Sequence, residues 1–254
     1  MILQAQNLTV AIGGKVICRD LNMAINVGEC WAVLGQNGVG KTTLLRTLVG
    51  LHAPQAGVVS CNGTALQAYA RRDLARHLAV LMQNDAGEFW GSVLEYVLLG
   101  RFPYRSTLFG YSVQDQAVAL QAIVSMDLAH LAQRPLNALS GGERQRAEIA
   151  QVLAQQAQCY LLDEPLQHLD VRHQAQTMQL FAQLRQQRST LLMALHDMQW
   201  AQRCCDHVLL LFADGHVLHG RADELLTHSH LEALYQCPLR EWIVEGERYY
   251  APGV

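Results

Sequence analysis

A glycine-rich segment between a strand pattern and a helix pattern constrains the fold of this 254-residue chain more than any other feature. The apolar block Cys30 to Leu34 is typical of a buried strand, and Thr43 to Gly50 has the apolar spacing of a helix. Between them lies Gly35-Gln36-Asn37-Gly38-Val39-Gly40-Lys41-Thr42. The chain must therefore leave a strand through a glycine turn and enter a helix at once.

Further apolar blocks recur along the chain and predict more buried strands. They are Ile2 to Leu8, Leu78 to Leu81, Tyr160 to Leu162, Leu191 to Leu195 and Val208 to Phe212. Between several of them lie stretches with apolar residues three and four positions apart, such as Glu143 to Gln156 and Val171 to Arg188. Because strands alternate with helices, we predict an α/β fold with a mostly parallel sheet.

The strand-like blocks stop from about residue 85 to residue 157, where helical patterns take over. The clearest of these patterns are Val93 to Leu99 and Val113 to Leu131. We expect a single domain over residues 1–254. In it, residues 1–84 and 158–254 form the core, and residues 85–157 form a helical insertion.

Composition and charge exclude several classes of protein. Half of the side chains are apolar and the net charge is −3, which argues against a nucleic-acid binder because such domains usually carry a basic face. No apolar run approaches the roughly 20 residues that cross a bilayer, and the amino terminus lacks a secretion leader. The seven cysteines include no C-x-x-C pair, which suits a reducing cytosol.

The glycine-rich segment has the composition of a phosphate-binding loop, G-x-x-x-x-G-K-[ST]. Glycines let backbone N–H groups approach phosphate oxygens, and the following helix adds its positive end. Lys41 would reach the β- and γ-phosphates, and Thr42 would ligate Mg²⁺. The predicted nucleotide-binding residues are Gly35, Gln36, Asn37, Gly38, Val39, Gly40, Lys41, Thr42 and Thr43. This loop alone leaves kinases, GTPases and many ATPases open.

Two successive carboxylates, Asp163 and Glu164, follow the apolar strand pattern Cys159 to Leu162. The carboxyl ends of strands are where α/β sheets bind ligands. We predict that Asp163 holds Mg²⁺ directly or through water, and that Glu164 orients and polarises the water that attacks the γ-phosphate.

Upstream of these carboxylates lies Leu139-Ser140-Gly141-Gly142-Glu143-Arg144-Gln145-Arg146. Together with the phosphate loop it resembles the ATP-binding cassette (ABC) ATPases, whose signature LSGGQ is present here as LSGGE, and the resemblance covers residues 2–235. It implies a P-loop core with an antiparallel amino-terminal part and a helical subdomain. It also implies a head-to-tail dimer, in which Ser140, Gly141 and Gly142 of one copy meet the γ-phosphate held by the other.

The resemblance assigns three more positions. Gln83 matches the glutamine that senses the γ-phosphate and Mg²⁺ and joins the two subdomains. His196 matches the histidine that contacts the γ-phosphate, and Asp170 matches the aspartate that links the two sites of the dimer.

The chain departs from the family pattern at two places. The family usually has an aromatic residue that stacks on adenine, and Ile12 occupies that position. We therefore expect weaker and less purine-selective nucleotide binding. Gln167 and His168 stand where Ser and Ala are usual, which leaves the coupling between the two sites open.

The stretch Val97-Leu98-Leu99-Gly100-Arg101-Phe102-Pro103-Tyr104 is similar to the ATPases of bacterial importers for ferric siderophores, haem and cobalamin. The resemblance implies ATP and Mg²⁺ as cofactors. It implies separate membrane permease subunits, an indirect periplasmic or lipoprotein binding protein, and a peripheral location on the cytoplasmic side of the inner membrane. The alternatives are the ATPase of another ABC transporter, for amino acids, phosphate or lipids, and a soluble ABC protein outside transport.

Overall fold

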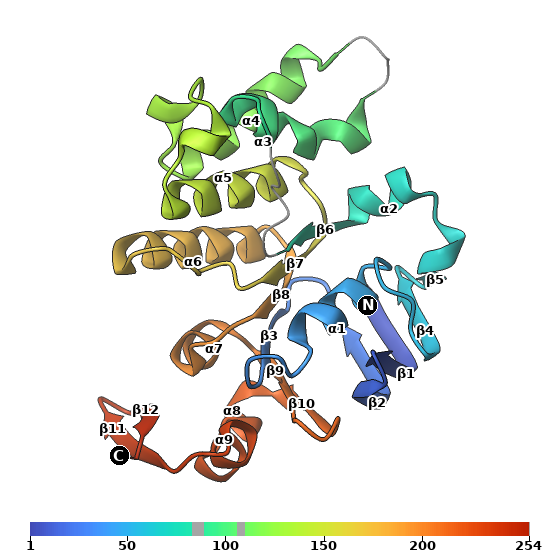
Figure 1. The fold of residues 1–254 in the computed structure, drawn as a ribbon, viewed down its shortest axis with the longest axis vertical. Helices are drawn as coiled ribbons and strands as arrows, with labels where there is room; N and C mark the ends of the chain where they lie inside the picture. The colour runs from blue at the N-terminus through green and yellow to red at the C-terminus, as the bar shows by residue number, and fades with distance from the viewer. Residues whose placement is uncertain (83–88, 106–109, 254) are drawn as a thin grey trace.

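A six-stranded sheet, assembled from strands far apart in the sequence, forms the centre of the structure (Figure 1). The computed structural model describes residues 1–82, 89–105 and 110–253. The strands of this sheet are β3 Cys30–Leu34, β6 Leu78–Leu81, β7 Cys159–Asp163, β8 Thr190–Ala194, β9 His207–Leu211 and β10 Val217–Arg221. They lie in the order β10-β9-β3-β8-β7-β6, and every neighbouring pair is parallel except β9–β10.

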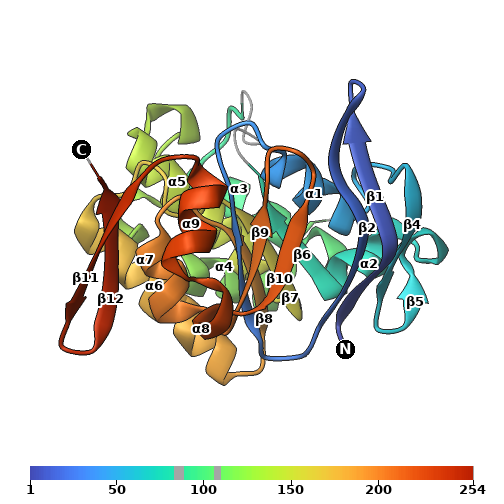
Figure 2. The ribbon, with the colours of Figure 1, turned by 90° about the horizontal axis from the view of Figure 1, so that it is seen from below.

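An antiparallel sheet packs against one face of the central sheet (Figure 2). Its strands are β1 Leu3–Ile12, β2 Lys15–Ile25, β4 Ala56–Cys61 and β5 Thr64–Ala65, in the order β2-β1-β4-β5. The predicted α/β fold, a mostly parallel sheet with an antiparallel amino-terminal part, is confirmed. The strand pattern missed β2 because exposed polar residues such as Arg19 and Asp20 interrupt its apolar positions.

Helices cover the central sheet, and along the sequence they alternate with its strands. They are α1 Lys41–Leu48, α2 Arg71–His77, α3 Val93–Leu98, α4 Val113–Ser125, α5 Gly141–Ala154, α6 Val171–Gln186, α7 Met198–Cys204, α8 Ala222–Leu225 and α9 His228–Tyr235. Shorter 3-10 turns span Leu66–Ala68, Leu99–Tyr104, Ala129–Leu131 and Leu136–Ala138. A hairpin of β11 Leu239–Val244 and β12 Glu247–Pro252 stands at one edge (Figure 2). Among the described residues, no helix is both long and apolar enough to cross a membrane.

One predicted helix was too long. The pattern from Val113 to Leu131 predicts a single helix, but α4 ends at Ser125. Asp127 adopts a left-handed backbone with φ of 55°, and the Leu128 N–H donates to the Ile123 carbonyl at 3.0 Å. This arrangement closes the last turn of the helix, so the apolar residues beyond it belong to a separate 3-10 turn.

The central sheet divides the buried apolar residues into two clusters. Along β3, Trp31 and Val33 face the antiparallel sheet and α1, whereas Ala32 and Leu34 face the helices on the other side. Both faces of the strand are therefore apolar, as expected for a parallel strand covered on both sides.

Two buried cysteines, Cys30 and Cys205, contact one another with their sulfur atoms 3.6 Å apart.

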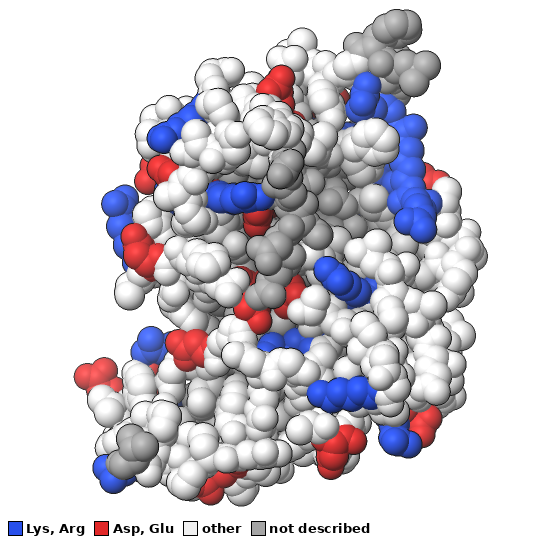
Figure 3. Space-filling view, in the orientation of Figure 1, with Lys and Arg blue, Asp and Glu red and all other residues white. Residues whose placement is uncertain are grey.

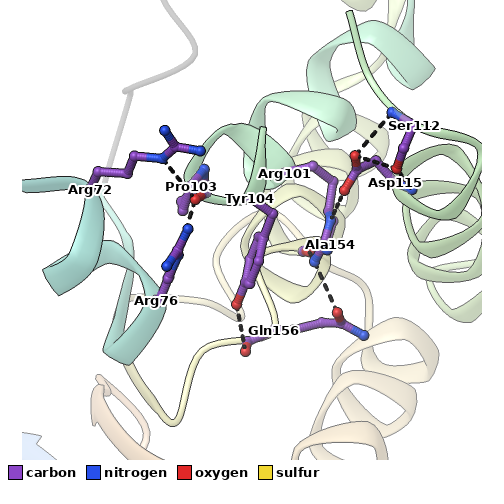
Figure 4. Close-up of polar contacts among 9 residues, drawn as sticks. All are labelled: Arg72, Arg76, Arg101, Pro103, Tyr104, Ser112, Asp115, Ala154 and Gln156. Atoms are coloured by element: carbon purple, nitrogen blue, oxygen red, sulfur yellow. Dashed lines mark hydrogen bonds and ion pairs between the residues drawn. The ribbon is translucent and has the colours of Figure 1, made fainter. Parts of the chain in front are cut away.

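A buried ion pair gives the stretch Val97–Tyr104 a structural role (Figure 4). The Arg101 side chain is 5% exposed, and its Nε lies 3.0 Å from Oδ1 of Asp115 on α4. Its Nη1 donates to the carbonyl of Ala154 and to Oε1 of Gln156, both at 2.9 Å. Arg101 therefore ties the 3-10 turn after α3 to α4 and to the carboxyl end of α5.

The same turn also contacts α2 of the core. The Pro103 carbonyl accepts from Nε of Arg72 at 3.0 Å and from Nε of Arg76 at 3.1 Å (Figure 4). The guanidinium group of Arg101 lies 4.0 Å from the centre of the Tyr104 ring. On the molecular surface, basic side chains gather along the edge near α2, which contains Arg71, Arg72 and Arg76 (Figure 3). The helices between β6 and β7 are therefore linked to the core not only by the chain itself but also by these hydrogen bonds between the turn and α2.

We expect Arg101→Met to destabilise the fold, because it leaves the buried carboxylate of Asp115 without its charged partner. Removing one partner of a buried ion pair costs about 3–5 kcal/mol in free energy of unfolding. Urea unfolding measures this change. The control is Arg221→Met, which removes an exposed partner of Asp223 and should leave the free energy of unfolding essentially unchanged. Equal effects of the two variants would contradict the role assigned to Arg101.

Candidate functional site

The glycine-rich loop lies between β3 and α1, at the carboxyl edge of the central sheet. Gly40 has φ of 122°, and a Cβ atom there would lie 2.5 Å from the Ile17 side chain on β2, so only glycine fits. Lys41 is 5% exposed, and its Nζ donates to the carbonyls of Gly35 at 2.9 Å and Gln36 at 3.3 Å. The loop therefore curls around the lysine ammonium group, and the amino end of α1 opens beside it.

A cavity of about 540 Å³ opens above this loop. The described lining residues come from four separate parts of the chain. They are Ile12, Lys15 and Ile17 of the β1–β2 hairpin; Asn37, Gly38, Gly40, Lys41, Thr42 and Thr43 of the loop and α1; Glu164 and Gln167; and His196. The volume lies within the roughly 300–1,000 Å³ typical of ligand sites. The fold thus brings the loop, a carboxylate and a histidine to one place.

Asp163 ends β7 with its side chain pointing into the protein beside the loop. It is 1% exposed, and no hydrogen bond of ordinary geometry reaches either carboxylate oxygen from the described residues. Burial raises its pKa, and the nearby charge of Glu164 adds to this shift, while the Thr42 hydroxyl and the Lys41 ammonium group lower the pKa. Two buried and unsatisfied oxygens next to a hydroxyl fit a hard divalent cation such as Mg²⁺.

Glu164 and His196 form a close pair at the cavity wall. Oε1 of Glu164 lies 2.5 Å from Nε2 of His196, and the glutamate side chain is 11% exposed against 45% for the histidine. Glu164 has φ of 51°, a left-handed conformation that is uncommon outside glycine, and its N–H donates to the Ala194 carbonyl at 3.1 Å. This backbone conformation directs the Glu164 carboxylate into the cavity lining, whereas the Asp163 side chain is not part of that lining.

Burial lowers the pKa of Lys41, and the carboxylates of Glu164 and Asp163 oppose this shift. The site thus contains one buried positive group, the buried acid Asp163 and the partly buried acid Glu164 at the end of one strand. Such an arrangement can bind a phosphate chain at the lysine and can offer a hydrogen-bond acceptor beside it.

The signature residues lie elsewhere. Ser140 caps α5, where its N–H donates to Oε2 of Glu143 at 2.7 Å and the Glu143 N–H donates back to its hydroxyl. The Glu143 carboxylate is therefore folded onto Ser140, and the Ser140 N–H lowers its pKa. A Cβ atom at Gly142 would lie 2.9 Å from the His168 carbonyl. Among the described residues, neither Ser140 nor its two following glycines line the cavity.

Among the described residues, five more of the predicted site residues are not part of the cavity lining: Gly35, Gln36, Val39, Asp163 and Asp170. Asp170 caps α6 by accepting from the His173 N–H at 2.8 Å, and this hydrogen bond lowers its pKa. The Gln36 side chain donates to the Leu234 carbonyl of α9 at 3.1 Å. Gln83 falls outside the described residues.

Lys15 belongs to none of the sequence motifs, yet it lines the cavity, and its Nζ donates to the Gly38 carbonyl at 3.1 Å. A signal was present in the sequence, because Gly13-Gly14 between two strands is a typical hairpin turn and predicts that Ile12 and Lys15 face one another.

The glycine loop joins the parallel strand β3 to a helix, and two acids lie at the carboxyl end of β7, which is two strands away from β3 in the sheet. These features define a nucleoside-triphosphate-binding protein of the P-loop type. The sequence pattern of the ABC transporter family matches residues 18–167. The chain therefore belongs to the ABC transporter family of ATPases.

The chain is similar to ATP-binding proteins of siderophore transport and hemin import. The ferric enterobactin transport protein FepC of Escherichia coli is 36% identical, over 98% of this chain and 93% of its own. The hemin import protein HmuV of Pseudomonas fluorescens is 37% identical, over 92% of each chain. A metal-chelate type ABC transporter solved in an inward-facing conformation superposes with a TM-score of 0.84 and 31% identity, covering 99% of this chain and 96% of that one.

We expect Ile12→Tyr to raise ATP affinity about three- to tenfold, because an aromatic ring stacks on adenine where the isoleucine offers only apolar contact. Ile12 is 50% exposed and lines the cavity, so a larger ring has room there. Equilibrium binding of ATP measures the effect. The control is Val58→Tyr, which adds the same ring at an exposed position of β4 away from the cavity lining. An unchanged affinity of the Ile12 variant would show that base stacking is not what this position lacks.

Proposed function

We propose that this chain binds and hydrolyses ATP as the energising subunit of a bacterial importer for a metal chelate, such as a ferric siderophore, haem or cobalamin. The observation that carries the ATPase part is the convergence of the glycine loop, Glu164 and His196 on one cavity. Support for the cargo class comes from the similar proteins, which are named for enterobactin and hemin transport and cover nearly all of the chain.

The phosphate chain of ATP would lie along the loop residues Gly35–Thr43, whose N–H groups and helix end attract anions. Lys41 would bridge the β- and γ-phosphates, exchanging its loop carbonyl partners for phosphate oxygens. Ile12 would contact the base. The buried position of Lys41 strengthens these contacts, because charges attract more strongly away from water.

Mg²⁺ would be held by Thr42 and Asp163, with Gln83 as a third ligand suggested by the family pattern. The buried, unsatisfied oxygens of Asp163 support this assignment. Bound there, the ion would neutralise charge on the β- and γ-phosphates.

Hydrolysis requires a water molecule in line with the bond from the γ-phosphorus to the leaving oxygen. Glu164 would orient that water and accept a hydrogen bond from it. His196, in contact with Glu164, would hold the carboxylate in position and reach the γ-phosphate with its ring. The oxygen of water would bond to phosphorus as the bridging P–O bond breaks. One proton of the water would pass to Glu164 and then to the released phosphate or the solvent, and ADP and phosphate would leave.

The site would be completed by a second copy of the chain. Ser140, Gly141 and Gly142 begin α5 and lie outside the cavity of their own chain, so they are available to a γ-phosphate held by the partner copy. Asp170 would lie at the contact between the two sites. Bound ATP then favours the closed dimer because it contacts both copies, and hydrolysis removes those contacts.

Closure would drive permease subunits in the membrane. We propose that the chain acts as one domain, with a core of residues 1–84 and 158–254 and a helical part of residues 85–157 that moves against it. The helical part and the segment around Gln83 would receive a cytoplasmic helix of the permease, which places the chain peripherally on the cytoplasmic face of the inner membrane. A periplasmic or lipoprotein binding protein would deliver the cargo from the other side.

We expect Glu164→Gln to retain ATP binding and to lower turnover by roughly a hundredfold or more, the range that a positioned acid–base group contributes. Lys41→Ala should instead lose ATP binding, because it removes the cation at the phosphates. Phosphate release and equilibrium ATP binding measure the two effects, and Glu245→Gln, an exposed substitution in the β11–β12 turn, is the control. A Glu164→Gln protein that hydrolyses ATP normally would overturn the assignment of Glu164.

The cargo is tested by uptake of labelled ferric siderophore, haem and cobalamin into cells that carry either the wild-type chain or Glu164→Gln. We expect selective loss of one cargo in the variant, because hydrolysis energises import. Unchanged uptake of all three would leave the ATPase assignment in place and would favour a transporter of another class, for amino acids, phosphate or lipids.

A further inference from the structure

The hairpin between β1 and β2 carries two side chains into the nucleotide cavity. Ile12 and Lys15 pair across the hairpin, and Gly13 and Gly14 form its turn with φ of 55° and 82°. Positive φ at both turn residues is the geometry of the tight hairpin turn that glycine favours. Both flanking residues line the cavity above the glycine loop. The tip of the hairpin is thus part of the nucleotide site.

Lys15 joins this tip to the glycine loop. Its Nζ donates to the Gly38 carbonyl at 3.1 Å, and two residues further along β2 the Ile17 side chain packs where a Cβ atom of Gly40 would lie. The hairpin and the loop are therefore held together by a polar contact and an apolar contact from the same strand. The ammonium group lies at the outer rim of the loop, on the side where the hairpin stands.

The cavity lining contains two lysines, Lys15 and Lys41. Lys41 is buried beneath the loop, whereas Lys15 is exposed at its rim. Ile12 beside it offers an apolar surface but no ring. Among the described residues, the part of the lining formed by Ile12 and Lys15 therefore presents a positive charge, which attracts phosphates, and an aliphatic side chain rather than an aromatic ring for the base.

We infer that Lys15 binds the phosphate chain of the nucleotide and makes recognition depend on charge more than on the base. This inference rests on the proposed nucleotide site. On binding, the ammonium group exchanges the Gly38 carbonyl for a phosphate oxygen, a stronger partner because it is charged. The contact involves no base atom, so it contributes equally to every nucleoside triphosphate. Because Lys15 is exposed, salt screens it.

The test is equilibrium binding of ATP, GTP and inorganic tripolyphosphate to the full chain, each at low and at high salt. Lys15→Met removes the charge and keeps most of the unbranched side chain, and Lys15→Arg keeps the charge. Arg19→Met is the matched control, because Arg19 is an exposed cation on the same strand that does not line the cavity. Circular dichroism of each variant checks that the fold is retained.

We expect Lys15→Met to weaken binding of all three ligands by about the same factor, roughly three- to tenfold at low salt and less at high salt. Lys15→Arg should bind nearly as the wild type does, and Arg19→Met should show no comparable loss.

Two results would overturn the inference. One is a loss confined to ATP and GTP with tripolyphosphate unaffected, which would place the contact on the base or the ribose. The other is a Lys15→Met affinity equal to that of Arg19→Met. Either result leaves the proposed ATPase function intact as long as Lys41→Ala loses binding, whereas failure of the wild-type chain to bind any of the three ligands would reject the proposed function itself.

Discussion

The parallel pairing of β3, β8 and β7 is the constraint on which the rest of the site depends. Parallel strands end at the same edge of a sheet, so the loop after β3, the acids after β7 and the histidine after β8 must meet there. The Leu195 N–H donates to the Val33 carbonyl at 3.1 Å, which continues the ladder to the residue before His196. These groups are far apart in the sequence, and the pairing of the strands brings them together.

The buried charges at this edge set the chemistry. Burial lowers the pKa of Lys41 while the carboxylates of Glu164 and Asp163 raise it, and burial raises the pKa of Asp163 while the Lys41 ammonium group lowers it. The left-handed backbone at Glu164 separates the two neighbouring acids, so that one points at the loop and the other at His196. Such backbone strain is common where function requires a side chain to be aimed. One strand end can thereby serve both a cation and an attacking water.

The central strands and the glycine loop could be predicted from local patterns, because residues close together in the sequence determine both. The pattern from Val113 predicted a helix that runs too far, since the turn at Asp127 has no strong sequence signal. The contacts of Arg101 and Lys15 could not be predicted from motifs, because their partners Asp115 and Gly38 are brought near only by the fold. The motifs also name Asp170 and Gln36 as site residues. In the structure, the Asp170 side chain accepts a hydrogen bond from the His173 N–H, and the Gln36 side chain donates one to the Leu234 carbonyl.

The central claim is that two copies of the chain close around ATP held by the glycine loop and part when Glu164 allows hydrolysis. Sedimentation of the purified Glu164→Gln chain, with and without ATP and Mg²⁺, tests it most directly. The account predicts a monomer without nucleotide and a stable dimer with it, because ATP that cannot be hydrolysed keeps both copies in contact. A chain that binds ATP yet sediments as a monomer under both conditions would contradict it.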